Sequence, residues 1–177
     1  SKNALVLDTR NADEFEHSHI KGSINIGLNG SFAVWVGSVI DIEQPLVIVC
    51  EAGKEQESIL RLARVGYEKV LGYLDGGIAA WAEEGKDIDN IASLSPEEFT
   101  MTIQHSKEIV VDIRKHGELE AEGMLKKAIH IPLSDLGQRM EELNPRAPYI
   151  IHCAGGYRSM IACSLLKANG FGNVRNV

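Results

Sequence analysis

The chain has 177 residues, of which 44% are hydrophobic and 24% charged, and its formal net charge at pH 7 is −7. This length allows one globular domain or two small ones. No apolar stretch approaches the roughly 18 residues of a membrane span, and the acidic balance without a long basic run argues against nucleic acid as a partner. Three cysteines without zinc-like spacing favour a reducing compartment, so we expect a cytoplasmic protein.

The first predicted strand is also the first half of an internal repeat. LVLDTR at 5–10 recurs as IVVDIR at 109–114, so that Asp8 and Asp112 are 104 positions apart. Later pairs keep nearly the same offset: 22–26 with 127–131, 46–50 with 149–153, and 62–67 with 166–171. The chain therefore contains a duplication. Because β-rich runs alternate with helical stretches in each copy, we predict an α/β fold with two mostly parallel sheets flanked by helices.

The boundary between the copies is expected near Asp89, which gives domains of residues 1–89 and 90–177. A capping box at 95–98, with proline at the first helical position, predicts a helix start in the second domain. A second helix is predicted just after Cys153, with Gly170 as its stop. Both Cys50 and Cys153 follow apolar strands, at the edge where open parallel sheets bind ligands.

Cys153 lies in a short loop between a predicted strand and a predicted helix. Such a helix start directs backbone N–H groups and the positive end of the helix dipole toward the loop. Gly155 and Gly156 can take conformations that curl the amides around an anion, and Arg158 can bind an oxyanion through two parallel hydrogen bonds. A cysteine in such a place has a pKa of roughly 3.5–7.5, against about 8.5 for a free thiol. Cys153 is therefore predicted to be a nucleophilic thiolate.

The loop of the first copy departs from this pattern. Cys50 is followed by three glutamates and no arginine. The loop is also predicted to be one residue shorter, because Cys50 to Leu62 spans 12 positions where Cys153 to Leu166 spans 13. Counting from the cysteine places Glu55 opposite the second copy's arginine, and counting from the helix places Lys54 there. Carboxylates near a thiol disfavour its ionised form, so this loop is predicted to be degenerate, with a structural or docking role.

Other polar residues are assigned structural roles. The repeated Asp-x-Arg pairs, also present in the copy without the arginine clamp, are interpreted as scaffold salt bridges. His152 is expected to pack or hydrogen-bond and not to act as a base, because adjacent side chains in a strand point to opposite faces of the sheet and His152 directly precedes Cys153. Cys163, inside the apolar helix, is expected to be a buried structural cysteine. The histidines form no ligand cluster by spacing, so no metal site is predicted.

These motifs resemble the rhodanese family. The resemblance rests in the second copy on Asp112-x-Arg114, AIHIPL at 128–133 and the loop 153–159, and in the first on Asp8-x-Arg10, HIKGS at 19–23 and DGGIAAW at 75–81. It implies sulfurtransferase activity through a persulfide on Cys153, without a cofactor. The residues implied to hold the persulfide and its donor are Ala154, Gly155, Gly156, Tyr157 and Arg158, with Ser159 closing the loop.

The expected reaction moves sulfane sulfur from a small-molecule donor to a thiol or to cyanide. Thiosulfate and a low-molecular-weight persulfide both remain open as donors. Cysteine phosphatases and arsenate reductases are the rival class, because they also place Cys and Arg around an oxyanion. They generally have five residues between the two, whereas four separate Cys153 from Arg158. This spacing favours sulfur over phosphate.

The ends of the sequence suggest an excised piece of a longer protein. The chain begins at Ser1, and the second copy stops at Val177, before any counterpart of 75–77, so this domain is expected to be truncated at its C-terminus. Tandem copies with a degenerate first loop resemble the C-terminal part of fusions with an N-terminal metallo-β-lactamase-fold domain. The alternative function is therefore an accessory or docking module that serves a missing hydrolase or persulfide dioxygenase domain, which would hold the metal.

Overall fold

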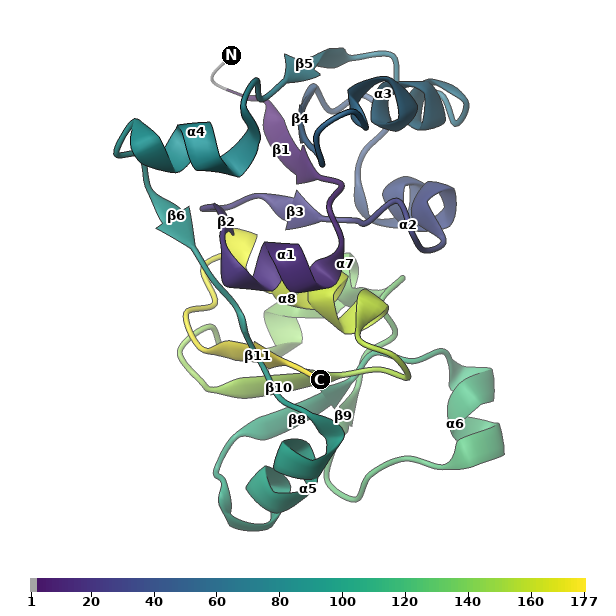
Figure 1. Ribbon diagram of the computed structural model, residues 1–177. Coiled ribbons are helices and arrows are strands. Elements are labelled where there is room, and N and C mark those ends of the chain that lie inside the picture. Colours follow the sequence, from purple (N-terminus) through teal and green to yellow (C-terminus); the bar gives the residue numbers. More distant parts are fainter. Residues whose placement is uncertain (1–2) are drawn as a thin grey trace. The chain divides into compact units, whose positions relative to one another are not determined.

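The computed structural model describes residues 3–177, and its contacts divide the chain into two compact units, Ser1–Asn90 and Ile91–Val177 (Figure 1). Ser1 and Lys2, which begin the first predicted domain, lie outside the described residues. Among residues 3–177, no helix is both long and apolar enough to cross a membrane. Each unit is an α/β layer structure, as the sequence predicts.

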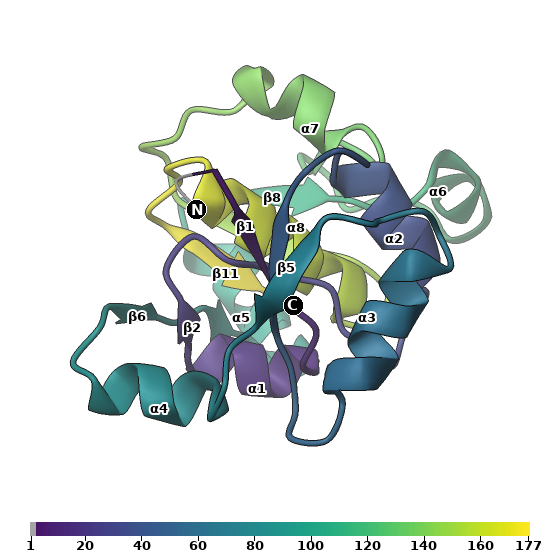
Figure 2. The same cartoon turned by 90° about the horizontal axis from the view of Figure 1, so that it is seen from above.

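The first unit is built on a parallel four-stranded sheet in the order β3-β1-β4-β5. Its strands are β1 Leu5–Asp8, β3 Ile24–Asn25, β4 Leu46–Val49 and β5 Val70–Tyr73. Its helices are α1 Ala12–His17, α2 Phe32–Val39, α3 Glu55–Ala63 and α4 Gly77–Glu83. Helices α2 and α3 cover one face of the sheet, and α1 and α4 lie on the other side (Figures 1 and 2). A small antiparallel pair joins β2 His19–Ile20 to β6 Ile88–Asp89.

The second unit has a parallel five-stranded sheet in the order β7-β11-β10-β8-β9. Its strands are β7 Ala92–Ser93, β8 Ile109–Asp112, β9 Ile129–His130, β10 Tyr149–His152 and β11 Val174–Asn176. Its helices are α5 Pro96–His105, α6 His116–Glu122, α7 Leu136–Arg139 and α8 Tyr157–Ala168, with a 3₁₀ turn at Met140–Glu142. Strand β8 is the repeat of β1, and β10 is the repeat of β4. Each sheet therefore contains one copy of the same pair of neighbouring strands.

The sequence signals for the helix ends in the second unit are confirmed. At the start of α5, Glu98 donates its backbone N–H to Ser95 Oγ (3.2 Å), and Ser95 donates its own to Glu98 Oε2 (2.8 Å). Helix α8 ends at Ala168, and Gly170 follows with a φ of 89°. That left-handed conformation suits glycine, which explains why the helix stops there.

A turn before the short edge strands differs between the repeats in one informative residue. In the first unit Gly22 occupies it with a φ of 81°, whereas in the second unit Lys127 occupies it with a φ of 70°. Lys127 is the only residue other than glycine with a positive φ in the described part of the chain. A side chain with a Cβ is strained in this conformation by roughly 1–2 kcal/mol.

Replacing Lys127 by glycine is therefore expected to stabilise the protein. The relief of strain exceeds the extra backbone entropy that glycine loses on folding, which leaves a gain of about 0.5–1 kcal/mol in the free energy of unfolding. Urea unfolding followed by circular dichroism measures it. The matched control is Gly22→Ala, which introduces the strain and should destabilise by a similar amount. A destabilised Lys127→Gly protein would show that the lysine side chain makes a contact worth more than the strain.

Candidate functional site

Strand β10 delivers Cys153 to the carboxyl edge of the second sheet. The strand is central in the sheet, Ile150 and Ile151 are fully buried, and Cys153 follows its last residue directly. Cys153 is itself 4% exposed. The loop after it is short, because α8 already begins at Tyr157. The thiol is thus held between the end of a rigid strand and the start of a 12-residue helix.

One glycine makes the turn from the loop into α8. Gly156 is the residue before the helix, with a φ of 77° and a ψ of −28°. Gly155, which the sequence also suggested for such a conformation, is not among the glycines with a positive φ. The first helical hydrogen bond runs from the Met160 N–H to the Gly156 carbonyl (3.0 Å). The N–H groups of the first turn lie outside this bonding pattern and point along the helix axis toward the loop, as at any helix start.

Ser159 is the nearest polar neighbour of the thiol. Its Oγ lies 3.2 Å from Cys153 Sγ, and it also contacts the Gly156 carbonyl (3.0 Å) and the Val177 carbonyl (2.8 Å). A hydroxyl has one proton, and a carbonyl can only accept. In the thiol form the S–H therefore donates to Ser159 while the hydroxyl donates to a carbonyl. When the sulfur is an anion, the same hydroxyl can rotate and donate to it.

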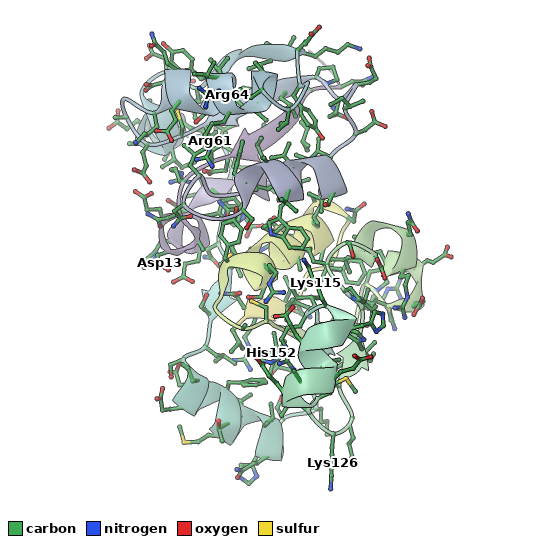
Figure 3. All side chains as sticks on the ribbon, turned by 90° about the vertical axis from the view of Figure 1, so that its right-hand side faces the viewer. Asp13, Arg61, Arg64, Lys115, Lys126 and His152 are labelled. Carbon is green, nitrogen blue, oxygen red and sulfur yellow. The ribbon has the colours of Figure 1, made fainter. Side chains whose placement is uncertain are left out.

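Arg158 is engaged by a partner that the sequence analysis missed. Its Nη1 donates to Glu118 Oε2 (2.6 Å), and its Nη2 donates to Glu118 Oε1 (2.7 Å). These bonds from Arg158 lower the pKa of Glu118 to about 2. Glu118 lies in α6, which begins just after Lys115, labelled together with His152 in Figure 3. The internal repeat carried a signal for it, because Glu14 and Glu118 both follow the repeated aspartate by six positions.

His152 has the packing role that the sequence suggested. Its ring stacks on Phe99, with centroids 5.4 Å apart and an angle of 19° between the planes. Burial lowers the pKa of His152, so the ring is neutral near pH 7. Its Nδ1 is buried without a hydrogen-bond partner among the described residues. The lowered pKa makes this imidazole a weaker base, and its stacking on Phe99 fits the packing role.

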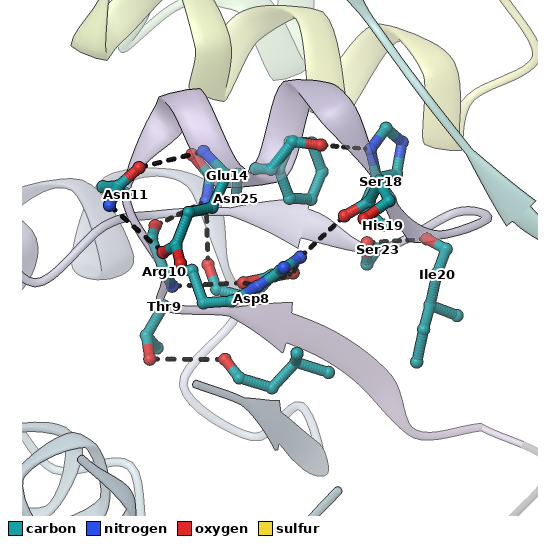
Figure 4. Close-up of polar contacts among 12 residues, drawn as sticks. Asp8, Thr9, Arg10, Asn11, Glu14, Ser18, His19, Ile20, Ser23 and Asn25 are labelled. Atoms are coloured by element: carbon teal, nitrogen blue, oxygen red, sulfur yellow. Dashed lines mark hydrogen bonds and ion pairs between the residues drawn. The ribbon is translucent and has the colours of Figure 1, made fainter. Parts of the chain in front are cut away.

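The two Asp-x-Arg pairs are buried salt bridges, as the sequence predicts. In the first unit Arg10 Nη2 lies 2.6 Å from Asp8 Oδ2 and 2.8 Å from the Ser18 carbonyl (Figure 4). In the second unit Arg114 Nη2 lies 2.8 Å from Asp112 Oδ2. Each arginine thus joins the end of its strand to the segment that follows the next helix.

Cys163, the third cysteine, is fully buried in α8, where burial raises the pKa of its thiol.

The loop of the first unit corrects one sequence prediction. The loop is not shorter: α3 begins at Glu55, five positions after Cys50, whereas α8 begins four positions after Cys153. The difference falls within the helix, because Leu62 follows the start of α3 by seven positions, whereas Leu166 follows the start of α8 by nine. The second helical position, held by Arg158 in α8, is held by Gln56 in α3 rather than by Lys54 or Glu55.

The side chains of this loop leave Cys50 in an unfavourable place for a thiolate. Glu55 Oε1 accepts the Gly53 N–H (3.1 Å), and Lys54 Nζ pairs with Glu57 (2.8 Å). The Glu55 carboxylate therefore occupies one loop N–H, and the charge of Lys54 is neutralised by Glu57. Burial and the Glu55 charge raise the pKa of Cys50 to about 11. The direction is the one expected from the sequence, and burial is the largest single cause.

A cavity of about 230 Å³ lies over this degenerate loop. Its walls include Thr9, Asn11, Glu51, Lys54 and Glu57, so it opens at the carboxyl edge of the first sheet. Two carboxylates and one lysine give it no excess of positive charge for an anionic donor. Among residues 3–177, no cluster of three or more His, Cys, Asp or Glu side chains is arranged to hold a metal ion.

Comparison with known proteins matches both parts of the chain to one family model. The model described as the rhodanese-like domain matches residues 1–84 and again residues 95–177. A putative sulfurtransferase of Bacillus subtilis, YtwF, is 34% identical over 85 residues, which cover 48% of this chain and 82% of that protein. The thiosulfate sulfurtransferase GlpE of Shewanella oneidensis is 34% identical over 84 residues, 47% of this chain and 80% of that protein. Each alignment has the length of one unit.

A solved structure matches nearly the whole chain at lower similarity. The thiosulfate sulfurtransferase from Pseudomonas aeruginosa is 25% identical, with a TM-score of 0.43. The alignment covers 98% of this chain, and this chain spans 38% of the length of that one.

Proposed function

The chain belongs to the rhodanese-like domain family, and we propose that it is a sulfurtransferase in which Cys153 carries the transferred sulfur as a persulfide. The observation that supports this most directly is the place of Cys153. It lies at the end of a central strand and under the start of α8, with Ser159 Oγ 3.2 Å from its sulfur. Ala154, Gly155 and Gly156 form the loop around it, and Tyr157, Arg158 and Ser159 are the first three residues of α8.

The reaction runs in two displacements at one sulfur. The Cys153 thiolate attacks the outer sulfur of thiosulfate, a new S–S bond forms, the bond to the sulfonate sulfur breaks, and the electron pair leaves with sulfite. With a low-molecular-weight persulfide as donor, a thiolate leaves instead. The enzyme persulfide is an anion, which the helix start and the Ser159 hydroxyl stabilise. A second thiolate or cyanide then attacks the outer sulfur and releases Cys153 as a thiolate.

The first unit is proposed to have a structural or docking role. Its cysteine has a raised pKa, and its loop has lost the arginine. These features also favour the alternative that the chain is an accessory module for an N-terminal metallo-β-lactamase-fold hydrolase or persulfide dioxygenase domain, a fusion predicted from the resemblance alone. The three free cysteines agree with the expected cytoplasmic location. Domains of residues 1–89 and 90–177 remain the proposed division.

The test is sulfur uptake at a named cysteine. After incubation of the reduced chain with thiosulfate, mass spectrometry of its peptides should show one added sulfur on the peptide with Cys153 and none on the peptide with Cys50. Cys50 is an internal control, because both thiols meet the same reagent in one chain. An unmodified Cys153 would favour the accessory module, and vanadate-sensitive release of phosphate from a phosphate ester would favour the rival phosphatase chemistry.

A further inference from the structure

Glu118 holds the arginine of the proposed active loop from outside the loop. Its carboxylate accepts two bonds from Arg158 and a third from the Lys115 backbone N–H (2.9 Å). The ion pair is largely enclosed, since the Arg158 side chain is 17% exposed and that of Glu118 is 29% exposed. With three donors around it, the carboxylate is fixed in position. The guanidinium plane is fixed with it, because a bidentate pair restricts rotation.

This contact changes the charge that a sulfur donor meets. Arg158 follows Cys153 by five positions, and the charges of the two side chains interact. The Glu118 carboxylate cancels most of the positive charge of Arg158 at a distance, so the loop attracts an incoming anion less than a free arginine would. A donor with two negative charges is opposed more strongly than a donor with one, because the repulsion from Glu118 scales with the donor charge.

The first unit shows what the same glutamate does without an arginine. Glu14 holds the equivalent position, but its carboxylate accepts the Asn11 side-chain N–H (3.1 Å), while the Asn11 side-chain oxygen caps the helix by accepting the Glu14 backbone N–H (2.9 Å). Burial and the neighbouring Glu51 raise the pKa of Glu14. The glutamate therefore suits the helix start in both copies, and its pairing with an arginine is confined to the copy whose cysteine is proposed to react.

We propose, on the basis of the proposed function, that Glu118 is a positioning residue that sets the donor preference: it orients Arg158 and makes the loop favour singly charged sulfur donors over doubly charged ones. Two donors separate the effect of charge from the chemistry. Thiosulfate is a dianion and releases sulfite, whereas benzenethiosulfonate is a monoanion and releases benzenesulfinate. In both, the Cys153 thiolate attacks the outer sulfur, an S–S bond forms, and the bond to the oxidised sulfur breaks with its electron pair on the leaving group.

The test compares the two donors in Glu118→Gln, which keeps the shape of the side chain and removes its charge. The ratio of kcat/KM for thiosulfate to kcat/KM for benzenethiosulfonate should rise about fivefold, as expected for one unit charge about 8 Å away at an effective dielectric constant of about 40. The rise should come mainly from a lower KM for thiosulfate. Glu118→Asp keeps the charge and should leave the ratio within about twofold of the unmodified chain.

Two matched controls make the same substitution at other carboxylates. Glu122→Gln removes the exposed partner of Arg114 from the same helix, and Glu14→Gln alters the equivalent position of the first unit. Both should leave the ratio unchanged. An unchanged ratio in Glu118→Gln, or an equal loss of kcat/KM with both donors, would overturn this inference while sulfur uptake on Cys153 still supports the proposed function. Absence of sulfur on Cys153 in the unmodified chain would instead contradict the proposed function itself.

Discussion

Replacing Cys153 by serine is expected to abolish sulfur transfer, with kcat/KM for thiosulfate and cyanide falling by roughly 10³-fold or more. A serine hydroxyl is not ionised near neutral pH and cannot form the S–S bond that carries the sulfur. The environment stays nearly the same, because the buried hydroxyl can donate to Ser159 Oγ as the thiol does. Thiocyanate formation measures the activity, and circular dichroism checks that the variant is folded.

Cys50→Ser is the matched control for this prediction. Cys50 occupies the same place at the end of β4, but burial and Glu55 raise its pKa to about 11. Its thiol is therefore protonated at neutral pH, and the Glu55 carboxylate takes a loop amide. We expect the activity of Cys50→Ser to stay within about twofold of the unmodified chain. Equal losses in the two variants would mean that both loops carry sulfur, and a loss in Cys50→Ser alone would reverse the roles of the two units.

The fold could be predicted because its signals are local and are repeated. The apolar runs at 5–7 and 109–111 lie in β1 and β8, and those at 46–49 and 149–151 lie in β4 and β10. Within each sheet the two strands are neighbours in parallel register, β1 with β4 in the first unit and β8 with β10 in the second. A buried parallel strand needs a continuous apolar run, which is visible in sequence without any knowledge of its partners. The capping box at Ser95 is equally local, since its two hydrogen bonds join residues three positions apart.

The site could be predicted only in part, because its decisive contact is not local. The loop around Cys153 was recognisable from its residues, but Glu118 and Arg158 are 40 positions apart in sequence. The length of the first loop also depends on a contact that the sequence spacing does not show. A helix starts at the residue whose backbone carbonyl accepts the first helical hydrogen bond. In α3 the Lys54 carbonyl accepts this bond from the Ser58 N–H. The spacing between the cysteine and the repeated leucine does not contain that information.

The second large effect is expected from Asp112→Ala, which should lower the free energy of unfolding by about 3–5 kcal/mol. The Asp112 side chain is fully buried and that of Arg114 is 8% exposed, so the substitution leaves a largely buried guanidinium with only the exposed Glu122 carboxylate as an ionic partner. Burial opposes ionisation of Asp112, but the hydrogen bonds from Arg114 outweigh it and lower its pKa. The stabilisation is therefore fully present above the unfolded pKa of about 4 and is lost as the pH falls below it.

Two further variants separate the ion pair from the packing around it. The double variant Asp112→Leu with Arg114→Met removes both charges at once, and it should recover about half or more of the lost stability, because no buried charge is then left unpaired. Glu122→Gln removes only the exposed end of the same network, whose carboxylate is 63% exposed, and should change stability by less than about 0.5 kcal/mol. Urea unfolding at pH 7 compares all three. If Asp112→Ala costs less than about 1 kcal/mol, the pair is not a scaffold element, and its repetition in both units would then need a role in the reaction.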